Sequence, residues 1–249
     1  IRDCSQSRGP GDVYKRQLKD YYREPLRLGR DVFTNGYLSD YNCEKLYSLL
    51  NRYKDIFEEQ GITTTHFIAT SALRDANNNT NIIEELKDQG IDVKVISGDI
   101  EASLLKNYDF THETEAIIDI GGGSVEICVK QGDSYKAKSF QLGAVRLLSY
   151  SQAEQTEAFK DLGAWLGQFS SIESLVGLGG NLRALMQANE ISSEFDTKLF
   201  DSYVQKYNSL SNDQLINEFN IPEDRIDIIP NALNTVSYTH LRAHETGYN

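Results

Sequence analysis

Cysteine is scarce in this sequence of 249 residues, and the three that occur, Cys4, Cys43 and Cys128, lie far apart. They form no CxxC pair and no cluster with histidine, so neither a disulfide framework nor a zinc site is expected. Few, scattered cysteines are typical of a reducing compartment, and we expect a cytoplasmic protein. The sequence also lacks an apolar run of about 18 residues, so we expect no transmembrane helix and no membrane partner.

Positive charge is also in short supply. Lys and Arg total 25 against 37 Asp and Glu, which gives a formal net charge of −12. Broad, sequence-independent binding to nucleic acid needs a basic surface, so that class of function is excluded. A small phosphorylated ligand is still allowed, because a local pocket can be positive on an acidic protein.

The two ends of the chain lack hydrophobic periodicity. Residues 1–17 and 236–249 show neither helical nor strand spacing of apolar residues. We expect both to be foreign, adapter-like sequence outside the fold, with natural disordered tails as the alternative. The first end carries a net charge of +2 and the last end zero, so residues 18–235 carry −14.

Between the ends, strands alternate with helices, which indicates an α/β fold. Apolar spacing predicts a helix through residues 46–57 that is capped by Ser39 or Asp40. Residues 65–73 are expected to form a strand that runs into a turn rich in Thr and Ser, and a second strand is expected at 91–97. A helix with Thr80 as its cap lies between them, and another helix follows at 98–108.

The pattern changes near residues 111–114, from strands alternating with helices to consecutive strands. We take this change as a boundary between domains 18–112 and 113–235. Residues 115–142 predict an antiparallel meander of three strands. Helices are expected to begin at 142–151 and to cover 154–169, and a strand, glycine loop and helix follow at 174–189. Residues 195–219 are expected to be helical.

The strongest local signal for chemistry is Asp119 followed by Gly121, Gly122, Gly123 and Ser124. Successive glycines can adopt positive φ and turn consecutive N–H groups toward one anion, which predicts phosphate binding. Asp119 ends an apolar strand and could hold Mg²⁺ through oxygen. Glu126 lies two residues beyond Ser124 and therefore shares a strand face with it. The pattern is neither GxxxxGK[ST] nor GxGxxG. A flexible hairpin turn is the alternative.

Two further segments carry candidate phosphate chemistry. Glu101 lies at the start of a helix, where it is either a general base for an attacking water or a favourable charge on the helix dipole. Thr70, Ser71 and Arg74 follow a strand and suit phosphate oxygens, with a capped helix start as the alternative.

A second glycine loop precedes the helix near residue 182. Gly179, Gly180 and Asn181 could present backbone N–H groups to a nucleotide or to more phosphates. A tight turn from strand to helix is the equal alternative.

The order of these segments resembles the exopolyphosphatase and guanosine pentaphosphate phosphatase family, Ppx/GppA. The resemblance rests on ATSALRDA, ISGDIEA, IIDIGGGSVEI, SFQLGAVRL and GLGGNLRAL, with RIDIIPNAL near the end. It implies the actin-like ATPase superfamily, in which two ribonuclease-H-like domains surround a cleft. The family's first phosphate loop has no counterpart here and its closing helix is expected to be missing, so the first domain is expected to be truncated.

The resemblance also implies roles for individual residues. Glu101 corresponds to the catalytic base, Asp119 and Glu126 to the acidic pair near Mg²⁺, and Arg74 to a phosphate-contacting arginine. The implied reaction is the release of inorganic phosphate from polyphosphate. Guanosine pentaphosphate as substrate and a non-catalytic protein that binds polyphosphate or an alarmone are the alternatives. An actin-like kinase is disfavoured because it needs no water-activating base, and a homodimer is compatible with the resemblance.

Overall fold

The structure of the protein is a computed structural model that describes residues 22–108, 115–169, 172–191 and 197–245. The first end, 1–17, and the expected domain boundary at 111–114 lie outside the described residues. Within the described residues, no helix has the length and apolar character needed to cross a bilayer.

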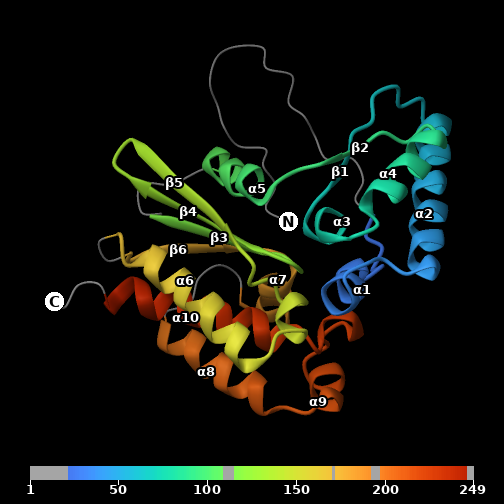
Figure 1. Cartoon of the computed structure of the whole chain (residues 1–249). Helices are drawn as coiled ribbons and strands as arrows, with labels where there is room; N and C mark the ends of the chain where they lie inside the picture. The colour runs from blue at the N-terminus through green and yellow to red at the C-terminus, as the bar shows by residue number, and fades with distance from the viewer. Residues whose placement is uncertain (1–21, 109–114, 170–171, 192–196, 246–249) are drawn as a thin grey trace, which may run out of the picture.

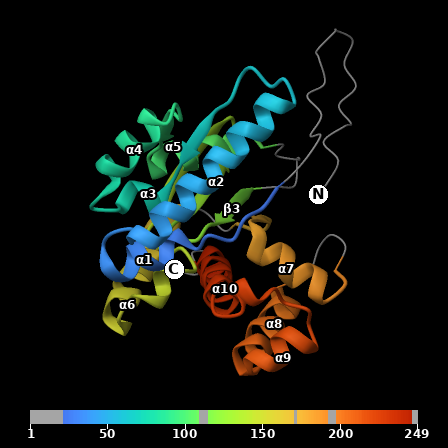
Figure 2. The ribbon, with the colours of Figure 1, turned by 90° about the vertical axis from the view of Figure 1, so that its right-hand side faces the viewer.

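The first elements surround a small parallel sheet, in which β1 (Phe67–Ala69) pairs with β2 (Val93–Val95). Figures 1 and 2 show four helices of this region near it. They are α1 (Leu28–Asn35), α2 (Asp40–Glu59), α3 (Ser71–Asp75) and α4 (Asn79–Asp88). Helix α5 (Gly98–Leu104) and the 3₁₀ turn η1 (Leu105–Asn107) follow β2 in the sequence.

Helix α2 begins where its cap and periodicity predict. The Ser39 hydroxyl accepts a hydrogen bond from the backbone N–H of Asn42 at 3.4 Å, and Cys43 and Leu46 face the interior. Capping satisfies one of the otherwise unpaired N–H groups in the first turn. The core on this side of the molecule consists of Val32, Leu38, Cys43, Leu46, Leu73, Ala76, Ile82, Leu86 and Ile91.

The prediction that Thr80 caps the next helix is wrong. Helix α4 begins at Asn79, and Asn78 stands at the cap position without a side-chain cap bond. The Asn78 amide is used elsewhere. Its Oδ1 accepts from the backbone N–H of Leu38 at 3.0 Å, and its Nδ2 donates to the carbonyl of Leu38 at 2.8 Å. Two hydrogen bonds across 40 residues therefore replace the local cap.

A larger sheet of four strands forms the second part of the molecule, in the order β5-β4-β3-β6. β3 (Ala116–Ile120), β4 (Val125–Gln131) and β5 (Ser134–Phe140) form the predicted antiparallel meander, and β6 (Leu175–Leu178) is parallel to β3. The remaining elements are η2 (Arg146–Leu148), α6 (Gln152–Leu166), α7 (Gly180–Ala188), α8 (Thr197–Ser209), α9 (Asn212–Asn217), η3 (Glu223–Arg225) and α10 (Ile229–Glu245).

The two faces of the large sheet pack against different helices. Ile118 and Ile127 belong to the main core, together with residues of α6, α7, α8 and α10. Ile117 and Cys128 point to the other face, where they meet Leu105 after α5. Figure 1 shows α5 on one side of this sheet and α6, α8 and α10 on the other. Helix α5 follows the small sheet in sequence but covers the large one.

Two helical predictions need correction. The helix expected at 142–151 is only the 3₁₀ turn η2, because the N–H groups of Ala144 and Val145 bond to the carbonyls of Gly121 and Gly122 instead of to a helix of their own. The helical segment expected at 195–219 is broken between α8 and α9, where Ser211 and Gln214 form a new capping box.

The end of the chain also differs from expectation. Helix α10 runs through Val236, which is buried, so residues 236–239 belong to the fold and a helix does follow RIDIIPNAL. Val236 joins Ala232 and Leu233 on the apolar face of the helix. Thr235 and Thr239 are also buried. Their hydroxyls are satisfied, because each donates a hydrogen bond to the carbonyl four residues earlier.

Candidate active site

A row of three polar side chains crosses the large sheet. Asp119 lies directly opposite Glu126, which in turn lies opposite Ser139. Opposite residues on antiparallel strands project from the same face, and this is the face that α5 covers. The Ser139 hydroxyl donates to Oε1 of Glu126 at 2.7 Å. The two predicted metal-binding carboxylates are therefore neighbours.

Burial dominates the electrostatics of this row. It raises the pKa of Glu126 to about 7, opposed by hydrogen bonds from Ser139 and Ser124 and reinforced by the negative charges of Glu101 and Asp119. Burial also raises the pKa of Asp119. Among the described residues, neither Asp119 nor Glu126 forms an ion pair with Lys or Arg.

Two neighbouring carboxylates, the buried Glu126 and the half-buried Asp119, fit a hard divalent cation, which would offset their mutual repulsion. The described residues contain no group of three His, Cys, Asp or Glu side chains arranged to hold a metal. Asp119 and Glu126 would thus supply only part of a coordination shell. That is the usual situation for Mg²⁺, which keeps several waters and takes further oxygens from substrate phosphates.

The glycine loop between β3 and β4 does not use the conformation expected for it. None of Gly121, Gly122 and Gly123 has positive φ. Glycine is required here by space. A Cβ on Gly123 would lie 2.3 Å from Cζ of Phe33 and 2.3 Å from Oγ of Ser71. The loop is therefore packed tightly against α1 and α3.

The carbonyl groups of the same loop accept hydrogen bonds from residues 144–146. Gly121 and Gly122 accept hydrogen bonds from the backbone of residues 144–146 at 2.9 to 3.1 Å, and Gly123 accepts one from Arg146 Nε at 2.6 Å. In a trans peptide the carbonyl and the following N–H point in opposite directions. The N–H groups of residues 122–124 therefore point away from residues 144–146, as an anion-binding loop requires.

Arg74 holds Glu101 beside this loop. Its Nη1 donates to Oε2 of Glu101 at 3.0 Å and to the carbonyl of Ile96 at 3.2 Å, and its Nε donates to Asp75 at 3.1 Å. Nη2 is buried and has no hydrogen-bond partner among the described residues. Buried donors are nearly always paired in folded proteins, so Nη2 is available to an anionic ligand.

Glu101 is an unusual carboxylate because its surroundings act in opposite directions. Burial raises its pKa, and the charges of Asp119 and Asp75 raise it further, while Arg74 lowers it. Its side chain is 19% exposed, so a small ligand or a water can reach it. A carboxylate with raised proton affinity beside an arginine suits proton transfer.

The two hydroxyl residues predicted beside Arg74 separate. Ser71 is buried against Gly123. Thr70 is exposed, and its side chain makes no cap bond to α3. Only Ser71 is brought to the loop, because α3 is a single short turn that points successive side chains in different directions.

The second glycine loop lies next to Asp119. Gly179 has φ of +104°, and a Cβ there would lie 3.2 Å from Oδ1 of Asp119. A Cβ on Gly180 would lie 2.3 Å from Nη2 of Arg225, whose Nη1 donates to the buried Asn181 at 2.8 Å. An arginine from η3 therefore covers the beginning of α7, which sequence reasoning missed.

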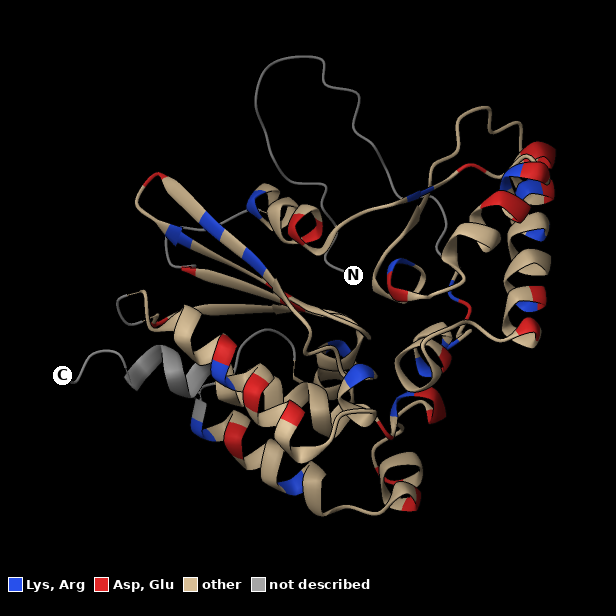
Figure 3. Cartoon of the chain, viewed as in Figure 1, with Lys and Arg blue, Asp and Glu red and all other residues tan. Residues whose placement is uncertain are grey.

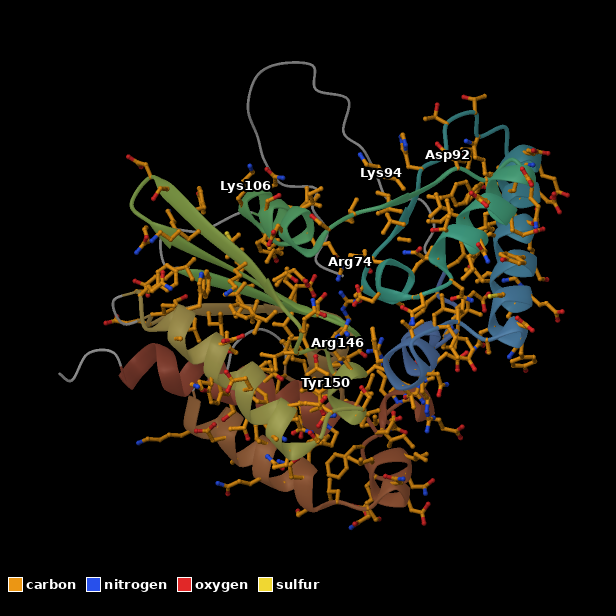
Figure 4. All side chains as sticks on the ribbon, viewed as in Figure 1. Arg74, Asp92, Lys94, Lys106, Arg146 and Tyr150 are labelled. Carbon is orange, nitrogen blue, oxygen red and sulfur yellow. The ribbon has the colours of Figure 1, made fainter. Side chains whose placement is uncertain are left out.

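Arg146 and Asp75 were missed as well. Arg146 pairs with Asp75, and its guanidinium lies 3.9 Å from the ring centre of Phe33. Figure 4 shows Arg74 and Arg146 in the space between α3 and the large sheet. Both new residues lie in segments that carry the family resemblance, but neither has a local glycine or strand pattern that would have singled it out.

Comparison with known proteins gives a consistent result. Residues 21–168 match the Ppx/GppA phosphatase family. The chain is 28% identical over 206 residues to a bifunctional 3-dehydroquinate synthase/phosphatase of Fusobacterium nucleatum, covering 72% of this chain and 31% of that protein. It is 29% identical over 129 residues to exopolyphosphatase 1 of Mycobacterium tuberculosis, covering 49% of this chain and 38% of that one. The chain thus spans about a third of the length of these curated relatives.

Solved structures show the same mixed α/β fold. An exopolyphosphatase from Cytophaga hutchinsonii has a TM-score of 0.72 at 19% identity, covering 88% of this chain and 80% of that one. A Ppx/GppA family member from Aquifex aeolicus has a TM-score of 0.66 at 22% identity, with coverages of 87% and 79%.

Proposed function

This chain belongs to the Ppx/GppA phosphatase family, and we propose that it hydrolyses terminal phosphoanhydride bonds, releasing inorganic phosphate from polyphosphate. One observation carries the proposal. Arg74 hydrogen-bonds Glu101 and keeps a buried, unpaired Nη2, and Ser71, three residues before it, packs on the glycine loop. The presence of exopolyphosphatases among the similar proteins supports polyphosphate as the substrate of the proposed reaction. We further propose that the regions built on the two sheets are the two expected domains, with the site between them.

In the proposed reaction, the N–H groups of residues 122–124 and Nη2 of Arg74 bind the oxygens of the terminal phosphoryl group. Preorganised donors of this kind stabilise the charge that develops on those oxygens. Water attacks phosphorus in line with the leaving phosphate, and Oε of Glu101 accepts the proton of that water. Burial raises the pKa of Glu101, and the hydrogen bond and charge of Arg74 oppose that rise by favouring the carboxylate form.

Asp119 and Glu126 would hold the Mg²⁺ that this family fold implies. When bound, the ion supplies positive charge that offsets the charge of the phosphate chain. The protein as a whole cannot attract a polyanion by its net charge, because that charge is −12. Figure 3 shows acidic and basic residues interspersed along α2 and α6. Binding of a polyanion therefore depends on groups inside the site.

Phosphate release from polyphosphate, guanosine pentaphosphate and ATP, each with Mg²⁺, tests the proposal. We expect release from polyphosphate, and we expect Glu101→Gln to lower the rate about 10²- to 10⁴-fold, the usual contribution of a general base. Glu84→Gln, on the exposed side of α4, is the matched control and should keep the full rate.

Each contrary outcome has a definite meaning. A Glu101→Gln variant that keeps the wild-type rate would remove Glu101 as the base. Preferential hydrolysis of guanosine pentaphosphate would change the substrate while keeping the reaction. Binding of polyphosphate without release of phosphate from any of the three would support a non-catalytic binding protein.

A further inference from the structure

Asp75 lies between two arginines that come from different parts of the molecule. Its Oδ1 accepts a hydrogen bond from Nε of Arg74 at 3.1 Å, and its Oδ2 pairs with Nη2 of Arg146. Arg74 belongs to α3, and Arg146 belongs to η2, which follows β5 of the large sheet. One carboxylate therefore joins the two regions.

The bond to Asp75 orients the guanidinium of Arg74. With Nε held by Asp75 and Nη1 held by Glu101 and the carbonyl of Ile96, the plane of the group is fixed at three points. Nη2, the remaining nitrogen, is buried and has no hydrogen-bond partner within the part of the chain that the structure describes. Asp75 is thus one of the three groups that fix the direction in which that donor points.

Arg146 makes the corresponding connection to the glycine loop. Its Nε donates to the carbonyl of Gly123 at 2.6 Å while its Nη2 pairs with Asp75. Its side chain is 12% exposed, and that of Asp75 is 27% exposed. Removing one member of a partly buried pair leaves an uncompensated charge, so each member matters more than in a surface ion pair.

We propose that Asp75 and Arg146 are positioning residues that hold Arg74 and the glycine loop at one fixed spacing, so that both bind the same terminal phosphate. Neither residue needs to contact the substrate. This inference rests on the proposed function, because it assigns the phosphate group that the two binding elements share.

The test compares Asp75→Asn, Arg146→Lys and Arg146→Met with the wild-type chain. We expect the KM for polyphosphate to rise about 10- to 100-fold in Asp75→Asn and Arg146→Met, the range found for residues that orient a binding group, with a much smaller change in kcat. Calorimetric titration with inorganic tripolyphosphate should show the same loss of affinity. Arg146→Lys should be intermediate, because an ammonium can pair with Asp75 but does not also hold the Gly123 carbonyl in the same geometry.

A double variant and a control sharpen the result. Asp75→Asn combined with Arg146→Met should be little worse than either alone, because both break the same bridge. Asp55→Asn, on the exposed side of α2, should leave KM and affinity unchanged. Additive effects on KM would overturn the inference.

The outcomes separate this inference from the proposed function. If the variants lower the thermal midpoint and apparent kcat while KM and tripolyphosphate affinity stay at the wild-type values, the pair is only structural and the inference is wrong. If the wild-type chain neither binds tripolyphosphate nor releases phosphate, the proposed function and this inference both fail.

Discussion

The large and small sheets differ in strand length and in how deeply their strands are buried. Strands β3 and β4 of the large sheet are buried over most of their length, and Ile118 at their centre is 0% exposed. Strands β1 and β2 have three residues each, and Ile68 in the middle of β1 is 61% exposed. The carboxylates Asp119 and Glu126 thus lie on well-buried strands of the large sheet. Arg74 lies in α3, directly after the short strand β1 of the small sheet.

This difference explains why contacts between the regions are so prominent at the site. Ser71 and Phe33 pack on Gly123, and Arg146 binds Asp75. Helix α5, which carries Glu101, packs on β4 and β5 of the large sheet. Residues that precede the large sheet in the sequence are therefore positioned at the site by contacts with that sheet and its glycine loop.

The largest effect on stability is expected for Ile118→Ala. The substitution leaves a cavity in the main core, and losses of about 2–5 kcal/mol are typical of such changes. Urea unfolding followed by circular dichroism measures the loss. A change below about 1 kcal/mol would show that the large sheet is not the more firmly packed region.

Glu126→Gln should change the pH dependence of stability in chelator-treated buffer. The pKa of Glu126 is about 7 in the folded chain and 4.5 ordinarily, so the folded state binds more protons between these values. Stability therefore falls as the pH rises from 4.5 through 7, by up to about 3 kcal/mol from this group. The variant should lose that part of the decline between pH 5 and pH 8. Parallel curves for variant and wild type would contradict the assignment.

Ser39→Ala tests how much the N-cap of α2 contributes to the stability of the region around the small sheet. The substitution removes the bond to the N–H of Asn42, and loss of a serine cap costs about 1 kcal/mol. Hydrogen exchange of the first turn of α2 should rise together with a lower urea midpoint. Unchanged exchange would mean that packing of α2 alone holds this helix end.

The smallest effect is expected for Ile68→Ala. An exposed side chain away from caps and cores contributes within about 0.5 kcal/mol. The same urea measurement that is used for Ile118→Ala provides the direct comparison. A loss approaching that of Ile118→Ala would show that the exposed face of the small sheet is covered in solution.

Local patterns were sufficient to predict much of the fold. The periodicity of α2, its Ser39 cap and the three-strand meander all follow from spacing within short segments. Such signals depend only on neighbours in sequence, so they survive without knowledge of tertiary contacts.

The missed features depend on partners distant in sequence. Asp75 and Arg146 are 71 residues apart, and Arg225 meets Asn181 across 44 residues. The glycines of the first loop were assigned to positive φ, whereas the close approach of Phe33 and Ser71 is what requires them. Helix α10 was missed because residues 236–249 were taken as foreign sequence without hydrophobic periodicity, whereas the helix runs from Ile229 to Glu245. Two of its buried residues are threonines, whose hydroxyls bond within the helix.

The most direct measurement is ¹⁵N NMR of the backbone amides of Gly122, Gly123 and Ser124 during titration with inorganic tripolyphosphate and Mg²⁺. If these amides bind the terminal phosphate, their signals should shift strongly and saturate together, while Gly61 and Gly132, which lie in open turns, stay in place. Signals of residues 122–124 that do not move at saturating tripolyphosphate would contradict the assignment of this loop as the phosphate site.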